Sequence, residues 1–157
     1  ASREIAAIVS ERTDTIIGGK MQSVFAIAVD RLAIGPALAV HGLFATAALA
    51  LLVMVIRRGP PFPVQAAAVI AATVLLTPYS FLYDCTVLTA AAAFLLTQPG
   101  ERQERLAVFA ALALPGLWFF TAEPLVPVSG LMILLVCLRA PGRQEAVRPL
   151  PDPPVPA

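Results

Sequence analysis

The sequence contains few charged residues and lacks one polar residue type altogether. Only 13% of its 157 residues are charged, asparagine is absent, and Lys20 is the single lysine. A soluble domain of this length usually carries roughly 25% charged residues. The long apolar runs and a hydrophobic content of 59% instead predict an all-α protein, a polytopic membrane helical bundle.

Residues that bind metals or form disulfides are equally scarce. Cys85 and Cys137 lie in different apolar segments without a CxxC pair, and His41 is the only histidine. These counts favour two buried free thiols over a disulfide or a metal site. His41 lies one turn inside an apolar segment, and we expect a satisfied interfacial residue there rather than a proton carrier or ligand.

Signatures of nucleotide and nucleic-acid chemistry are also missing. The chain has no Walker loop, no Rossmann glycine fingerprint, no HExxH motif and no serine elbow. Its formal net charge is +1 and no basic stripe is present, which argues against nucleic acid as a partner. We therefore expect neither a nucleic acid nor a protein-bound cofactor.

What is present divides the chain into three regions. We expect residues 1–35 to form an extracytoplasmic polar segment with an interfacial helix, and residues 36–138 to form a transmembrane helical bundle. Residues 139–157 are rich in proline and are expected to be a disordered cytoplasmic tail. The first residue is Ala1, and no signal-peptide pattern follows it, so the chain is expected to be the C-terminal part of a longer protein.

About five membrane segments are expected within the bundle. They cover residues 36–56, 64–77, 85–97, 106–122 and 125–138. The first would reach about 31 Å as a helix, enough to cross the hydrocarbon core, whereas the next two reach only about 20 Å each. Either those two helices continue through the turn between them and thin the bilayer, or the pair dips into the membrane. A charged connector is expected at residues 98–105, and Pro115-Gly116 is expected to kink the helix after it.

The arginines predict how the bundle is oriented. If the segments alternate in direction, every arginine beyond the first segment lies on one side: Arg57, Arg58, Arg102, Arg105, Arg139, Arg143 and Arg148. The positive-inside rule makes that side cytoplasmic. The protein is then a multi-pass protein of the cell inner membrane with a cytoplasmic C-terminus. Residues 1–33 and 77–84 would face the opposite compartment.

The turn at residues 77–84 (TPYSFLYD) interrupts an apolar stretch and is the first candidate site. Pro78 lacks an amide hydrogen and disfavours helical geometry at the residue before it, so we expect the helix to break there. Ionisable groups such as Asp84 at membrane depth suggest a binding site or a wet cavity. Tyr79 and Tyr83 also fit an interfacial belt, and Asp84 needs a partner such as Arg31, a tyrosine hydroxyl or a bound cation.

A second candidate precedes the first spanning segment. Ser23 is placed to cap a short helix whose apolar face would consist of Val24, Ile27, Ala28 and Leu32. Gln22 and Arg31 would lie off that face. These polar residues fit a cap with a solvated surface, but an arginine beside a membrane can also hold a phosphate by bidentate hydrogen bonds.

The order of these short motifs resembles one protein family. The motifs are Gln22-Ser23-Val24-Phe25 followed by Arg31 and Gly35, an Ala/Leu helix ending in Arg57-Arg58, and Pro78-Tyr79 with Tyr83-Asp84. Over residues 20–97 they resemble the C-terminal half of glycosyltransferase family 87. That family contains polyprenyl-phosphate-mannose-dependent mannosyltransferases with the GT-C membrane fold, and it often has asparagine where this chain has Met21.

The resemblance implies an integral membrane hexosyltransferase. Such an enzyme would move a hexose, with mannose the expected sugar, from a polyprenyl-phosphate donor to a lipid or glycan acceptor outside the cytoplasm. The catalytic base of GT-C enzymes is an aspartate in an early extracytoplasmic loop, so it is expected upstream, and this chain alone is expected to be inactive. The resemblance gives substrate-binding roles to Tyr79, Tyr83, Asp84, Gln22, Ser23 and Arg31. The alternative is a transporter subunit or a non-catalytic membrane scaffold, because broken helices with polar turns also occur in transporters.

Overall fold

The computed structural model describes residues 21–117 and 125–140, and these residues form an all-α structure. The elements in chain order are α2 (Val24–Val29), α3 (Ile34–Arg57), α4 (Phe62–Leu76), the 3-10 helix η2 (Leu82–Cys85), α5 (Thr86–Leu96), α6 (Arg102–Ala113), the 3-10 helix η3 (Leu114–Leu117) and α8 (Val126–Arg139). Within the described ranges there is no strand beyond one isolated bridge between Met21 and Phe81. The prediction of an all-α fold is confirmed. Most of the predicted N-terminal segment and nearly all of the predicted tail lie outside the described residues.

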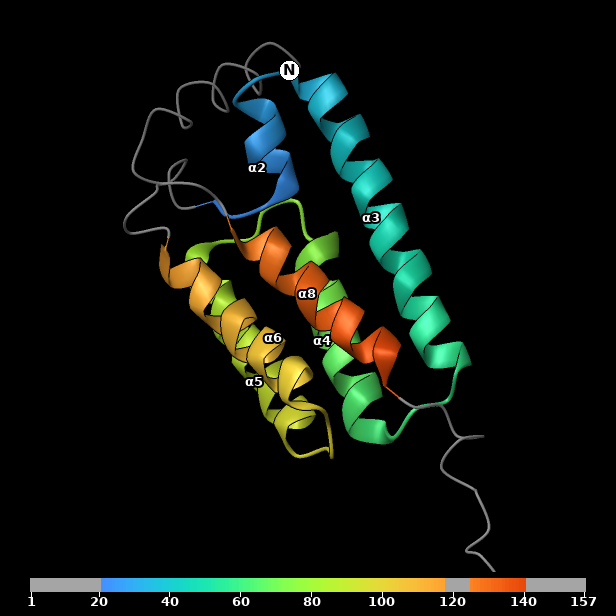
Figure 1. Cartoon of the computed structure of the whole chain (residues 1–157). Coiled ribbons are helices and arrows are strands. Elements are labelled where there is room, and N and C mark those ends of the chain that lie inside the picture. The colour runs from blue at the N-terminus through green and yellow to red at the C-terminus, as the bar shows by residue number, and fades with distance from the viewer. Residues whose placement is uncertain (1–20, 118–124, 141–157) are drawn as a thin grey trace, which may run out of the picture.

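The longer helices alternate in direction. Figure 1 shows α3, α4, α5, α6 and α8 packed as a bundle, with α2 beside the N-terminal half of α3. The C-terminal ends of α3 and α8 and the N-terminal ends of α4 and α6 lie together. This end of the bundle, which we call the arginine end, carries Arg57, Arg58, Arg102, Arg105 and Arg139. The alternation that the sequence predicts is therefore present in the structure.

Small residues allow α4 and its neighbours to approach closely. Four alanines of α4 are at most 1% exposed: Ala67, Ala68, Ala71 and Ala72. On the facing helix α8, a Cβ atom added to Gly130 would lie 2.9 Å from a methyl group of Leu75. Small residues at helix contacts are characteristic of membrane bundles, where close backbone approach replaces the hydrophobic driving force.

Helix α3 packs on the bundle along one stripe and exposes the rest of its surface. Its buried residues are Ala37, His41, Ala48 and Val55. Large apolar side chains cover the exposed surface, including Leu38, Leu43, Leu49 and Met54. Only 17% of its most apolar stretch is buried, although its 24 residues would span about 36 Å. Of the described helices, α3 alone has the length and composition to cross a bilayer, while α4, α5 and α8 are apolar but shorter.

Local sequence explains where α3 and α4 meet. Gly59 has a φ angle of 61°, in the left-handed region that favours glycine after a helix end. Pro63 lies in the first turn of α4, where a missing amide hydrogen costs nothing. The Arg58 guanidinium donates a hydrogen bond to the carbonyl oxygen of Leu138 at the end of α8. This contact ties the α3–α4 connection to the C-terminal end of α8.

The expected charged connector at residues 98–105 is too long. Helix α6 already begins at Arg102, four residues before the predicted start at Leu106. Its first turn carries a capping box, in which the Glu104 carboxylate accepts from the backbone amide of Glu101 at 3.1 Å. The same helix ends at Ala113 and continues as the 3-10 helix η3, which contains Pro115 and Gly116, and the rest of the predicted segment lies outside the described residues.

The predicted buried face of the first short helix is wrong in part. Helix α2 buries Phe25 and Ala28, whereas Leu32 lies beyond its end and is 44% exposed. The helix has only six residues, and its orientation is set by contact with α3 rather than by its own apolar pattern. Gln22 was expected off the apolar face, yet its side chain is buried.

Candidate functional site

The break between α4 and α5 follows from Pro78. Helix α4 ends at Leu76, and Thr77 has an extended backbone, as expected for the residue before a proline. The chain then turns at Pro78 and Tyr79 and enters η2 at Leu82. The helices therefore do not continue through the turn, and the polar residues of this segment lie at the end of the bundle opposite the arginine end (Figure 1).

The segment before α2 packs against this turn. The Gln22 backbone amide donates to the Ser80 carbonyl oxygen at 2.6 Å, and Met21 forms an antiparallel bridge with Phe81. The Ser23 hydroxyl donates to the Pro78 carbonyl oxygen at 2.5 Å. The structure thus brings together two candidate groups separated by 55 positions in the sequence. We refer to residues 21–23 and 77–84 as the polar corner.

Ser23 has two roles in the polar corner. Its hydroxyl oxygen accepts from the Ala26 amide at 3.1 Å, which caps α2 as the sequence predicts. The same hydroxyl donates its proton to Pro78, so one side chain fixes both the start of α2 and the turn. Because the residue is 3% exposed and both functions of the hydroxyl are used, it has little capacity left for a ligand.

Gln22 is the unsatisfied residue of the polar corner. Its side chain is 1% exposed, and neither its amide oxygen nor its amide nitrogen has a partner in the described part of the chain. A buried polar group left without a hydrogen bond costs about 1–3 kcal/mol. The narrow space beside it has no room for a water molecule and is bounded by Ser23, Val24, Phe44, Val74, Leu75, Val126 and Pro127.

Asp84 is satisfied locally. Its carboxylate accepts from the backbone amide of Phe81 at 2.8 Å, which caps the first turn of η2. The partner that the described residues show is therefore this backbone amide, whereas the sequence predicted Arg31, a tyrosine hydroxyl or a cation. The carboxylate therefore fixes the shape of the turn and is already engaged at one oxygen.

The remaining candidates do not converge on one pocket. Tyr79 is 57% exposed and packs edge-on against the Phe25 ring, with ring centroids 5.6 Å apart. The backbone of Tyr83 lies in η2, and its side chain lies outside what the structure describes. Arg31 follows α2 in an exposed turn. The two tyrosines do not share one helix, because Tyr79 lies in the turn before η2.

His41 lies at the same end of the bundle, as its position near the start of the first spanning segment predicts. Its ring is 6% exposed, and Nε2 lies 3.3 Å from the Leu76 carbonyl oxygen, the last residue of α4. Nδ1 has no partner in the described residues, so the expectation of a fully satisfied histidine is wrong. The spacing from Ala37 to His41 places both on the buried stripe of α3, and this periodicity was the available signal.

The polar corner contains the amide of Gln22, the hydroxyl of Ser23 and the carboxylate of Asp84. No cluster of three histidine, cysteine or carboxylate side chains occurs among the described residues. An amide such as that of Gln22 both donates and accepts hydrogen bonds, which suits hydroxyl-rich ligands. Comparisons with family models, with curated proteins and with solved structures found no match to this chain.

Proposed function

We propose that this chain is the C-terminal part of an integral membrane glycosyltransferase that moves a hexose, with mannose the expected sugar, from a polyprenyl-phosphate donor to a lipid or glycan acceptor. The polar corner would be part of its sugar- or acceptor-binding surface. In this reaction the bond between the sugar and the donor phosphate breaks, and a new bond forms to an acceptor hydroxyl. The proton of that hydroxyl would pass to a base in the upstream part of the protein.

Placement in a membrane is supported by the surface of α3. A helix of this length in the core of a soluble protein would be mostly buried, whereas α3 exposes large apolar side chains along most of its surface. Lipid would cover this surface. The shorter helices α4, α5 and α8 would cross with α3 as one polytopic bundle, because they pack against one another through small residues.

The buried amide of Gln22 is the observation that carries the proposal. Native proteins rarely leave both polar atoms of a buried side chain unpaired, and such an exception needs an explanation. Sugar hydroxyls both donate and accept, so they can satisfy an amide at both of its atoms. The resemblance of Gln22-Ser23 to a motif of glycosyltransferase family 87 agrees with this role.

The other residues of the polar corner would position Gln22. Ser23 and Asp84 hold the backbone of α2 and of the turn through the hydrogen bonds described above. These hydrogen bonds hold residues 21–23 against the turn in the ligand-free protein; because the space beside Gln22 has no room for a ligand, we expect the Ser23–Pro78 bond to open when one binds. Tyr79 is exposed at the rim and would contact the ligand first.

The substitution Gln22→Leu tests the proposal in the full-length protein. Leucine has a similar size and no unpaired polar atoms, so we expect the free energy of unfolding to stay equal or to rise by about 1 kcal/mol. We expect sugar transfer from polyprenyl-phosphate mannose to fall by about 10-fold or more, as when a positioned polar group is lost. Transfer would be measured with radiolabelled donor in membranes that contain equal amounts of each variant.

The matched control is Gln103→Leu. Gln103 is exposed on α6 near the arginine end, so the same chemical change there should leave transfer unaltered. If Gln22→Leu transfers sugar at the wild-type rate, Gln22 has no binding role and the proposal loses its main support. If the full-length protein shows no transfer at all but moves a solute across vesicle membranes, the transporter alternative is correct.

A further inference from the structure

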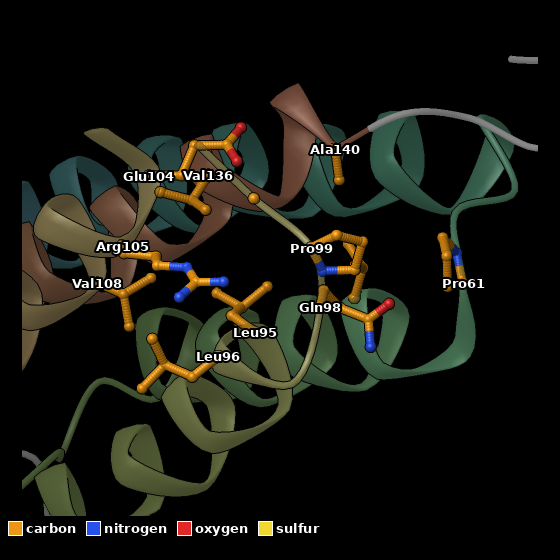
Figure 2. Close-up of a pocket in the computed structure, with 12 residues that line it drawn as sticks. Pro61, Leu95, Leu96, Gln98, Pro99, Glu104, Arg105, Val108, Val136 and Ala140 are labelled. Carbon is orange, nitrogen blue, oxygen red and sulfur yellow. The ribbon is translucent and has the colours of Figure 1, made fainter. Parts of the chain in front are cut away.

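A second site candidate lies at the arginine end, far from the polar corner. A pocket of about 80 Å³ opens between α4, α5, α6 and α8, and Figure 2 shows its walls. Its apolar walls are formed by Val64, Leu95, Leu96, Val108 and Val136. Gln98, Glu104 and Arg105 add polar groups to the same lining. A pocket that is mostly apolar with a few charged groups suits an amphipathic ligand.

The charge at this end favours an anion. The described residues of the arginine end include five arginines and two glutamates, a net of three positive charges. The described residues at the opposite end include Asp30, Arg31 and Asp84, a net of one negative charge. A negatively charged ligand is therefore attracted to the pocket end of the bundle.

Arg105 is the arginine that faces the pocket. Its neighbour Glu104 is committed to the capping box with Glu101, and Figure 2 shows the Glu104 carboxylate turned away from the Arg105 guanidinium. The guanidinium of Arg58 is also engaged, because it donates a hydrogen bond to the Leu138 carbonyl oxygen. Among the described residues, no carboxylate forms an ion pair with Arg105. The N–H groups of its guanidinium are therefore available to an anion.

We propose that this pocket binds an anionic phospholipid. One acyl chain would enter between α5 and α6 against Leu95, Leu96 and Val108, while the lipid phosphate would accept hydrogen bonds from Arg105. Basic pockets between membrane helices on the cytoplasmic side are known to hold acidic lipid head groups in this way. The inference rests on the proposed membrane placement but not on sugar transfer, because the pocket lies at the end of the bundle opposite the polar corner.

Lipid binding to the full-length protein in detergent micelles tests the proposal. Native mass spectrometry would count bound dioleoyl-phosphatidylglycerol and, separately, bound dioleoyl-phosphatidylcholine, which has the same chains and no net charge. We expect the protein to prefer phosphatidylglycerol. The substitution Arg105→Gln should weaken its binding by about 10-fold or more, because a charged hydrogen bond is lost.

Two further variants separate the pocket from the general surface charge. Arg102→Gln removes the same charge from the same helix, but outside the pocket. We expect it to weaken phosphatidylglycerol binding by no more than about fivefold. Leu96→Trp should fill the acyl site and weaken binding of both lipids without unfolding the protein, because Leu96 is only half-buried. Thermal unfolding of each variant would verify that the fold is intact.

Three results would overturn the proposal. They are equal binding of the two lipids by the wild type, equal losses for the two arginine variants, and unchanged binding for Leu96→Trp.

Discussion

At the scale of single residues, Asp84 shows how a functional pattern can have a local cause. An acid in an apolar stretch suggests a ligand or a buried ion pair. In the structure its carboxylate instead accepts from the Phe81 amide three residues earlier. The residue acts on the polar corner by fixing the turn, and this makes it a positioning residue in the proposed site.

This role leads to a prediction that separates shape from charge. Asp84→Asn keeps an oxygen that can accept from Phe81, so sugar transfer by the full-length protein should stay within about threefold of wild type. Asp84→Ala removes the cap and should lower transfer by about 10-fold, with a loss of about 1 kcal/mol in stability. Transfer assays and thermal unfolding of both variants would measure this. An equal loss of sugar transfer in Asp84→Asn and Asp84→Ala would show that the negative charge itself contacts the ligand.

The sequence predicted the residues of the polar corner better than their contacts. Ser23 as a helix cap and Pro78 as a helix break rest on local backbone chemistry, and both are confirmed. The burial of Gln22 and the unpaired Nδ1 of His41 depend on how α2 packs on α3 and against the turn. A six-residue helix has too weak a periodicity to determine that packing.

At the scale of the elements, the contact between α4 and α8 depends on a glycine. Gly130 lies in α8 where a side chain would collide with Leu75 of α4. Gly42 of α3 offers a contrast, because an added Cβ there meets nothing within 4 Å. The same residue type therefore has a packing role in one helix and none in the other.

The two glycines provide a matched test of this packing. Gly130→Leu should destabilise the protein by about 1–3 kcal/mol, because a methylene-rich side chain is forced into a filled contact. Gly42→Leu should be neutral or stabilising, since leucine is the better helix former and faces open space. Thermal unfolding in detergent would compare them. Similar effects for both variants would mean that α4 and α8 do not pack as described.

Helix boundaries were predictable where a proline or glycine fixes them. The end of α3 at Arg57, two residues before Gly59, and the end of α4 before Pro78 agree with the sequence to within about two residues. The sequence predicts the start of α6 four residues after Arg102, because a charged run is typical of a loop. The Glu101 and Glu104 pair is a capping-box arrangement with glutamate in place of serine, so the usual signature of a helix start was absent.

At the scale of the whole molecule, the two ends of the bundle differ in charge and in structure. The described arginine end is positive and holds an apolar pocket, and the opposite end holds the polar corner. The alternation of helices that creates this polarity was predictable from the spacing of apolar segments. The pocket was not, because it depends on how four helices pack around the loop at residues 97–101.

The proposed function needs these two ends to lie on opposite sides of a membrane. The corner must face the compartment where the polyprenyl-phosphate sugar is used, and the arginine end must face the cytoplasm. The exposed apolar surface of α3 must then lie in the lipid between them. Each of these statements can be examined with a single cysteine and a thiol reagent that does not cross membranes.

Cysteine labelling in spheroplasts is the most direct test of the account. The full-length protein, with Cys85 and Cys137 replaced by alanine, would carry Tyr79→Cys, Gln103→Cys or Leu43→Cys. We expect an impermeant maleimide to label Tyr79→Cys in intact spheroplasts, and Gln103→Cys only after permeabilisation. Leu43→Cys, at a position that is 75% exposed in the protein alone, should stay unlabelled in both conditions because lipid covers it. Labelling of Gln103→Cys but not Tyr79→Cys in intact spheroplasts, or ready labelling of Leu43→Cys, would contradict the account.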